Sequence, residues 1–172
     1  MRLLSWNYQR LGNPWIGRSL LKFVKDQVPD VCFLMETRLD EDGFNDLYRD
    51  LPFKNKLFVK KPNAGGGLAL LWKQDIQLDL INYSEHHILV KVREDDGFEW
   101  FLTGFYGWLE SDQKSKSWVL LSHLAMFAKG PWCCIGDFNS ILYAAENRVH
   151  VHCRLGKWRN LGVLWRRMAW LT

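Results

Sequence analysis

Polar side chains that could do chemistry stand at the ends of four separate apolar stretches of this chain. They are Asn7, Glu36, Tyr106, Asp137 and Asn139. Strand interiors disfavour Asp and Asn, and a glycine such as Gly136 lets the backbone turn sharply, so these side chains are predicted to emerge at the carboxyl ends of buried strands. Each could be an ordinary turn residue. If the four strand ends point the same way, however, the side chains converge on one face, where open α/β sheets place their ligands.

Together these five side chains suit metal-assisted hydrolysis of a phosphoester. The Glu36 carboxylate suits Mg²⁺, a hard cation that takes oxygen ligands. A second carboxylate beside a carboxamide, as at Asp137 and Asn139, can orient and deprotonate a water, and the Tyr106 phenol can donate a hydrogen bond to a phosphate oxygen. These residue types therefore predict a hydrolytic site that uses a divalent metal.

Hydrophobic periodicity predicts the strands and helices that must position these side chains. Continuous or alternating apolar runs predict strands over residues 2–6, 31–35, 56–59, 68–72, 76–83, 88–92, 100–105 and 132–135. Apolar residues at spacings of three and four predict helices over residues 20–28, 40–51, 112–128 and 155–171. The consecutive strands in the middle of the chain favour antiparallel pairing within a mixed sheet, so the predicted fold class is α/β.

Some side chains and turns in these elements have a predicted environment. The inward-facing residues of the helix at 112–128 are predicted to be Trp118, Leu121, Leu124 and either Phe127 or Ala128. His86 and His87 lie in an acidic turn and are predicted to be solvent-exposed. The glycine run at 65–67 follows two lysines, but a phosphate-binding P-loop opens a helix, whereas these glycines lead into a predicted strand. A tight turn is the prediction there.

The composition indicates a single globular domain. The chain has 172 residues, of which 48% are hydrophobic and 24% charged, enough for one domain with a substantial core. Charges interrupt every apolar stretch well short of a bilayer span, and no signal-peptide pattern is present. We therefore expect a nuclear or cytoplasmic protein with no membrane segment and no obligate protein partner. The four cysteines lack CxxC spacing and are expected to be reduced, with Cys32, Cys133 and Cys134 buried as small hydrophobes.

The positive charge of the chain is concentrated at its C-terminal end. Residues 1–146 carry 17 basic and 19 acidic side chains, whereas residues 147–172 carry six basic and no acidic ones, which gives −2 and +6. This end could contact a phosphate backbone, or it could be a solvated helix face. His150, His152 and Cys153 are candidates for a soft-metal site, but a distant fourth ligand is not evident.

Five motifs in order resemble the successive signatures of one superfamily. They are Leu3-Leu4-Ser5-Trp6-Asn7, Pro29-Asp30-Val31-Cys32-Phe33-Leu34-Met35-Glu36-Thr37, Gly66-Gly67-Leu68-Ala69-Leu70-Leu71-Trp72, Thr103-Gly104-Phe105-Tyr106-Gly107 and Gly136-Asp137-Phe138-Asn139. The sequence thus resembles the endonuclease/exonuclease/phosphatase superfamily, and most closely the endonuclease domain of plant LINE-type (non-LTR) retrotransposons. The resemblance covers residues 1 to about 142, and five ordered motifs are more specific than a lone Gly-Asp-Phe-Asn.

The resemblance implies a four-layered α/β sandwich that nicks DNA with Mg²⁺, or with Mn²⁺ in its place. By motif match, Glu36 is the main metal ligand, with Asn7 nearby in the metal site. Tyr106 contacts the scissile phosphate. Asp137 polarises or deprotonates the attacking water, and Asn139 orients the water and the phosphate. DNA, contacted through its phosphate backbone, is the implied partner.

The sequence also departs from the family pattern. The family's last signature, Ser-Asp-His, supplies a histidine that contacts the phosphate in the transition state and an aspartate that completes the metal site, yet Asp-His occurs nowhere in this chain. We therefore expect a partial domain at 1–146 that lacks its C-terminal half, with strands left as exposed edges, and a basic segment of uncertain origin at 147–172. Removing a transition-state donor commonly costs about a hundredfold or more in rate, so weak or absent nuclease activity is expected.

Two other functions stay open at this point. A phosphatase of the same superfamily, acting on an inositol phosphate or a sphingolipid headgroup, shares the Glu, Asn and Gly-Asp-Asn types of motif. A non-catalytic fragment could instead bind nucleic acid through the basic, Trp-containing segment at 147–172, by phosphate contacts and stacking.

Overall fold

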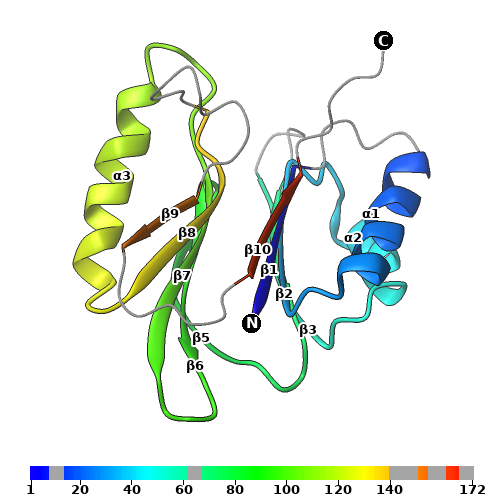
Figure 1. The fold of residues 1–172 in the computed structure, drawn as a ribbon. Helices are drawn as coiled ribbons and strands as arrows, with labels where there is room; N and C mark the ends of the chain where they lie inside the picture. Colours follow the sequence, from blue (N-terminus) through cyan, green and yellow to red (C-terminus); the bar gives the residue numbers. More distant parts are fainter. Residues whose placement is uncertain (8–13, 62–66, 140–150, 155–161, 167–172) are drawn as a thin grey trace. The chain divides into compact units, whose positions relative to one another are not determined.

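The chain folds into two compact units, each built on one five-stranded sheet (Figure 1). A computed structural model describes residues 1–7, 14–61, 67–139, 151–154 and 162–166, with the backbone alone for residues 14–16, 151–154 and 162–166. The first unit comprises Met1–Asp75 with Asn160–Thr172, and the second comprises Ile76–Arg159. The predicted α/β class is confirmed.

The sheet of the first unit has the strand order β10-β1-β2-β4-β3. Its strands are β1 (Arg2–Asn7), β2 (Val31–Met35), β3 (Asn55–Val59), β4 (Leu68–Trp72) and β10 (Gly162–Arg166). β1 pairs in parallel with β2 and β10, while β4 is antiparallel to both β2 and β3. All five residues of β2 are buried, as expected for a continuous apolar strand with both faces covered.

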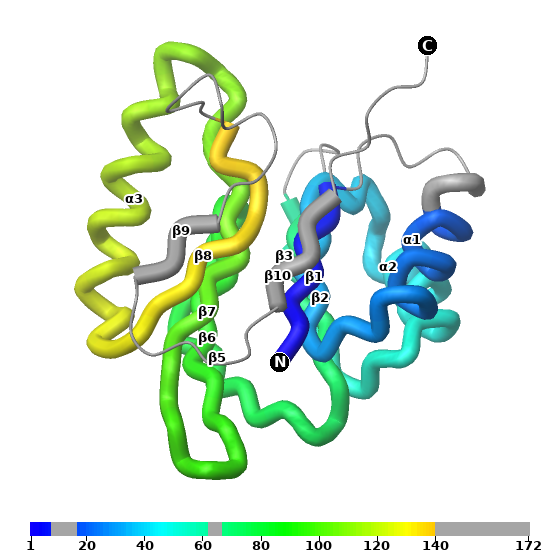
Figure 2. The backbone as a smooth tube through the Cα atoms, in the orientation of Figure 1, coloured from blue at the N-terminus to red at the C-terminus, as the bar shows by residue number. Residues whose placement is uncertain are grey.

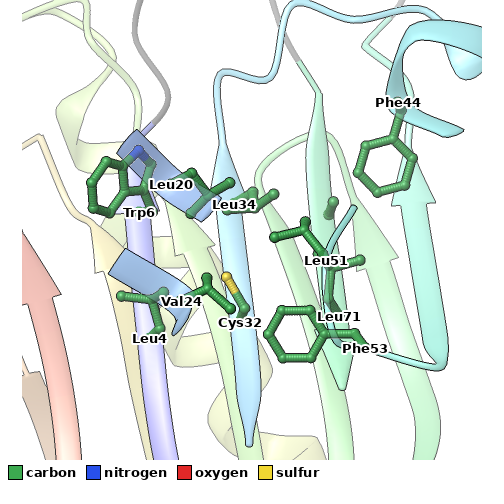
Figure 3. Packing of buried hydrophobic residues seen from close by; sticks show 11 residues of the cluster. Leu4, Trp6, Leu20, Val24, Cys32, Leu34, Phe44, Leu51, Phe53 and Leu71 are labelled. Atoms are coloured by element: carbon green, nitrogen blue, oxygen red, sulfur yellow. The ribbon is translucent and has the colours of Figure 1, made fainter. Parts of the chain in front are cut away.

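Two helices, α1 (Pro14–Gln27) and α2 (Glu41–Arg49), cover one face of this sheet (Figure 1). Figure 3 shows Leu20 of α1 beside Trp6 and Leu34 of the sheet, and Val24 of α1 beside Leu4 and Cys32, all within one cluster of buried residues. Asp40 caps the start of α2 by accepting a hydrogen bond from the backbone N–H of residue 43 at 2.9 Å. Because the cap satisfies an N–H group that would otherwise be unpaired, it fixes the residue at which α2 begins after β2.

The second unit has the strand order β5-β6-β7-β8-β9 and one long helix. Its elements are β5 (Gln77–Ser84), β6 (His87–Arg93), β7 (Glu99–Tyr106), α3 (Lys114–Phe127), β8 (Trp132–Asp137) and β9 (Val151–Arg154). β5, β6 and β7 form the predicted antiparallel meander (Figure 2), and β8 then joins β7 in parallel. α3 lies on one face of this sheet (Figure 1), where Leu124 packs against Leu89, Phe105, Cys134 and Phe138.

One expectation about the C-terminal end is wrong. The apolar spacing predicted one helix over residues 155–171, but residues Gly162–Arg166 form the strand β10, paired with β1. β10 is an edge strand of the first sheet next to β1, and β9 is an edge strand of the second sheet next to β8. Pairing with an existing strand overrode the local helical pattern here. The predicted boundary at residue 146 stays a prediction.

The buried face of α3 differs in part from the predicted one. Leu124 and Ala128 are buried, as predicted, but Trp118 is 37% exposed and Phe127 is 49% exposed. Because α3 is apolar on several sides, sequence spacing alone does not choose between its faces. Cys32, Cys133 and Cys134 are buried free thiols, as predicted. Among the described residues, no helix is both long and apolar enough to cross a membrane.

Candidate active site

The first unit brings Asn7 and Glu36 together at the carboxyl ends of β1 and β2. These two strands run parallel, with Asn7 opposite Met35 in the register, so the residue after Met35 stands beside the end of β1. Asn7 Nδ2 donates a hydrogen bond to Glu36 Oε1 at 3.4 Å. Glu36 is only 9% exposed, which places a carboxylate in a largely buried position beside a carboxamide.

The backbone at Glu36 is held in an unusual conformation. Its φ of 51° is left-handed, a region that residues other than glycine rarely adopt. The next peptide is fixed because the Thr37 N–H donates to the carbonyl oxygen of Gly67 at 3.2 Å. Residue 67 also lies close to the neighbouring strand β3 and has room only for glycine, since a Cβ there would lie 2.8 Å from the Val59 carbonyl oxygen. Such local strain clusters at functional sites.

The donor chemistry of Asn7 and Glu36 fits Mg²⁺. A carboxylate and a carboxamide offer oxygen donors, and Mg²⁺ is commonly held by one or two carboxylates while it keeps several waters. Within the described residues, no group of three or more His, Cys, Asp or Glu could hold a metal. Of the three candidate soft-metal ligands, His150 lies outside the described residues, and His152 and Cys153 belong to β9, which is described by its backbone alone.

The second unit brings Tyr106, Asp137 and Asn139 together at the carboxyl ends of β7 and β8. The parallel register pairs Tyr106 with Asp137. A hydrogen bond continues this pairing beyond the end of β7, because the Gly107 N–H donates to the Asp137 carbonyl oxygen at 2.8 Å. Asn139 Nδ2 completes the pairing by donating to the Gly107 carbonyl oxygen at 2.7 Å.

Asp137 and Asn139 also form a local turn with each other. The Asn139 N–H donates to Asp137 Oδ1 at 3.0 Å, and Asn139 has a left-handed φ of 50°, which Asn tolerates better than most residues. This turn orients the Asp137 carboxylate. Both side chains are half-buried, whereas Tyr106 is 6% exposed. The turn-forming role and the predicted water-activating role of these residues are therefore compatible.

Sequence reasoning missed two histidines beside this group, which is a correction to the predicted exposed turn. His86 is 7% exposed and His87 is 3% exposed. The reason is that β6 begins at His87, which pairs with Phe105, so the turn folds onto the end of β7. Counting the register back from the predicted meander would have placed His86 opposite Tyr106.

Comparison of the whole sequence with models of protein families identifies the family to which this fold belongs. The sequence model of the Endonuclease/Exonuclease/phosphatase family matches residues 4–169 of the chain. The chain belongs to this family. The superfamily named by the five sequence motifs is therefore confirmed, and the match extends through both β9 and β10. No curated protein sequence matches the chain significantly.

Several solved structures share the fold of this chain. The human Nocturnin catalytic domain with bound sulfate is 21% identical, with a TM-score of 0.57 over 78% of this chain and 63% of that one. D. rerio TDP2 humanized by 14 mutations is 16% identical, with a TM-score of 0.61 over 81% and 62%. A family protein from Bacteroides thetaiotaomicron is 14% identical, with a TM-score of 0.60 over 79% and 62%. The chain thus spans less than two thirds of each of these structures.

His87 is expected to make this family domain less stable in mild acid. Burial, and then the neighbouring His86, lower the pKa of His87 from 6.5 to about 4. The folded state keeps the imidazole neutral, while the unfolded state takes up a proton as the pH falls below 6.5. The free energy of unfolding should therefore decrease from pH 6.5 to about 4, by about 1 to 3 kcal/mol from this group. Urea unfolding at a series of pH values measures the slope.

A matched pair of variants isolates this contribution. His87→Gln removes the buried imidazole, so the loss of stability between pH 6.5 and 4 should become smaller than in the wild type. His123→Gln removes an exposed imidazole on α3 and should leave the slope unchanged. An identical slope in His87→Gln and the wild type would contradict the prediction.

Proposed function

We propose that the chain is a Mg²⁺-dependent phosphodiester hydrolase that nicks DNA and derives from the endonuclease of a LINE-type retrotransposon. The observation that carries the proposal is the pairing of predicted site residues at the ends of parallel strands in each unit. Asn7 contacts Glu36 in one unit, and Asp137 is tied to Asn139 and the end of β7 in the other. Each pair supplies part of the chemistry of phosphoester hydrolysis.

The roles of the side chains follow from their chemistry. Glu36 and Asn7 would hold Mg²⁺, which when bound would polarise the scissile phosphate and stabilise its developing charge. Asp137, oriented by the Asn139 N–H, takes the proton of the attacking water. The Asn139 carboxamide orients that water, and the Tyr106 phenol donates a hydrogen bond to a phosphate oxygen.

The structural relatives support a nucleic-acid substrate and leave a phosphatase as the second candidate. One structure of D. rerio TDP2 is a complex with a single-strand DNA product. ANGEL2, another structural relative, is described as a 2',3'-cyclic phosphatase. Release of phosphate from an inositol phosphate, without DNA nicking, would favour the phosphatase.

Turnover is proposed to be slow. The Asp-His pair that ends the family pattern is absent from the whole sequence, and the loss of one transition-state donor commonly costs about a hundredfold or more in rate. The test is nicking of supercoiled plasmid by excess protein, with Mg²⁺ or with EDTA. We expect slow nicking that needs Mg²⁺ and is lost in Asp137→Ala.

A control variant separates chemistry from general damage. Asp112→Ala removes an exposed carboxylate of the same unit and should nick like the wild type. Rapid multiple turnover by the wild type would contradict the impairment. Nicking that persists in Asp137→Ala, or no nicking dependent on Mg²⁺, would contradict the hydrolase assignment.

A further inference from the structure

His86 completes the backbone pairing of Tyr106 with its imidazole ring. The Tyr106 N–H donates to the His86 carbonyl oxygen at 2.8 Å. In a regular hydrogen-bonded antiparallel pair, the N–H of the opposite residue would donate back. Here the His86 N–H instead donates to Ser84 Oγ at 3.1 Å, and His86 Nδ1 lies 2.9 Å from the Tyr106 carbonyl oxygen. Because a carbonyl oxygen only accepts, Nδ1 is the nitrogen that carries the proton.

The imidazole is also fixed by a stacking contact. The His86 and Trp108 rings lie 3.6 Å apart between centroids, with an angle of 19° between their planes. The backbone that carries the Trp108 ring is held in turn, because the Trp108 backbone N–H donates to Ser117 Oγ at 3.1 Å, and Ser117 is a buried residue of α3. The ring that donates to Tyr106 therefore has little freedom to move.

Tyr106 is consequently held from both neighbouring strands. On the β8 side, the register pairs Tyr106 with Asp137, and the next residue, Gly107, donates to the Asp137 carbonyl oxygen at 2.8 Å. On the β6 side, His86 accepts from the Tyr106 N–H and donates to its carbonyl oxygen. The direction of the Tyr106 side chain depends on the position of its main chain, and the hydrogen bonds to the neighbouring strands on both sides hold that main chain in place.

We infer that His86 is a positioning residue for Tyr106. By donating a hydrogen bond to the Tyr106 carbonyl oxygen, His86 sets the position of the Tyr106 phenol. The inference rests on the proposed function for the role of the phenol in hydrolysis. A misplacement of a reacting group by about 1 Å can cost up to about a hundredfold in rate, so the hydrogen bond from Nδ1 has a kinetic consequence that simple burial of His86 would not have.

Two substitutions separate the hydrogen bond from the stacking contact. His86→Phe keeps an aromatic ring against Trp108 but cannot donate, whereas His86→Asn keeps a donor near the position of Nδ1 but loses the ring. In single-turnover nicking, His86→Phe should be slower by about tenfold to a hundredfold, and His86→Asn should restore most of the rate. In a Tyr106→Phe background, His86→Phe should have no further effect, because its action passes through the phenol.

A readout without activity keeps this test distinct from that of the proposed function. The ionisation of the Tyr106 phenol, taken as the ultraviolet titration of the wild type minus that of Tyr106→Phe, should shift in His86→Phe and not in His86→Asn. If the wild type does not nick DNA, the proposed function fails and this titration still decides the role of His86. An unchanged titration in a folded His86→Phe, or equal effects of both substitutions, would overturn the inference.

Nitrogen NMR of the wild-type ring provides the decision if His86→Phe does not fold. The inference requires a proton on Nδ1 of neutral His86. A neutral ring that carries its proton only on Nε2 would overturn it.

Discussion

Replacing Gly136 with alanine is expected to lower the free energy of unfolding by about 3 kcal/mol or more. Gly136 has a backbone φ of 139°, a value that L residues with a side chain rarely adopt. A Cβ atom at this position would also lie 1.9 Å from the carbonyl oxygen of Phe105 in the paired strand. Because the obstacle is backbone rather than a flexible side chain, β7 and β8 would have to separate at the Phe105–Gly136 pair, directly beside the pair of Tyr106 with Asp137.

Gly97→Ala is a matched control for the backbone conformation. Gly97 also has a left-handed φ, of 81°, but apart from the glycine and its two chain neighbours no atom lies within 4 Å of its added Cβ. Its cost should be limited to conformational strain of about 1 kcal/mol. Urea unfolding of both variants gives the difference, which measures the close approach of the two strands. Equal losses in the two variants would contradict the prediction.

The strands that position the candidate site could be predicted because their sequences leave few choices. The segment Val31–Met35 is continuously apolar and stops at a carboxylate, and β2 ends at that point with every residue buried. Gly136 predicted a turn near the end of β8 for the same local reason, although the strand runs through Gly136 to Asp137 and the left-handed residue that follows it is Asn139. These features depend on the residues of a single stretch, so periodicity and turn chemistry are sufficient to find them.

The environment of His86 and His87 depends instead on a distant strand. Their acidic neighbours indicate an exposed turn, but the pairing of His87 with Phe105 buries both rings. The stretch at 162–166 behaves in the same way, since its apolar spacing fits a helix while its pairing with β1 makes it a strand. Local propensity is a weak prior where a partner strand is available.

The pairing of Asn7 with Glu36 shows how much of the site such reasoning can reach. Two apolar runs ending in polar residues predict neighbouring strand ends, and the parallel register of β1 and β2 brings Asn7 Nδ2 within 3.4 Å of Glu36 Oε1. The left-handed φ of Glu36 could not be predicted, because it accompanies a contact with a distant part of the chain, the hydrogen bond from the Thr37 N–H to the carbonyl oxygen of Gly67, the residue before β4. The sequence thus predicts which groups meet, and the tertiary contacts decide how they are oriented.

Replacing Glu36 with glutamine is expected to reduce Mg²⁺-dependent nicking by about a hundredfold or more, or about 3 kcal/mol of transition-state stabilisation. The substitution keeps the size of the side chain and an oxygen that can accept from Asn7 Nδ2, so the fold should be retained. It removes the negative charge that suits Mg²⁺, so the affinity for the ion should fall. Nicking rates as a function of Mg²⁺ concentration and Mn²⁺ binding followed by electron paramagnetic resonance measure the two effects separately.

Two further variants make the Glu36 result specific. Glu110→Gln removes an exposed carboxylate and should leave both nicking and Mn²⁺ binding unchanged. Asn7→Ala removes the neighbouring carboxamide, and it should weaken ion binding less than Glu36→Gln because a neutral oxygen contributes less to the attraction of a divalent cation. Wild-type Mn²⁺ affinity in a folded Glu36→Gln protein would show that this carboxylate does not hold the ion, even if nicking were lost. Reduced affinity in Glu36→Gln together with normal affinity in Glu110→Gln would instead identify the ends of β1 and β2 as the metal-binding part of the site.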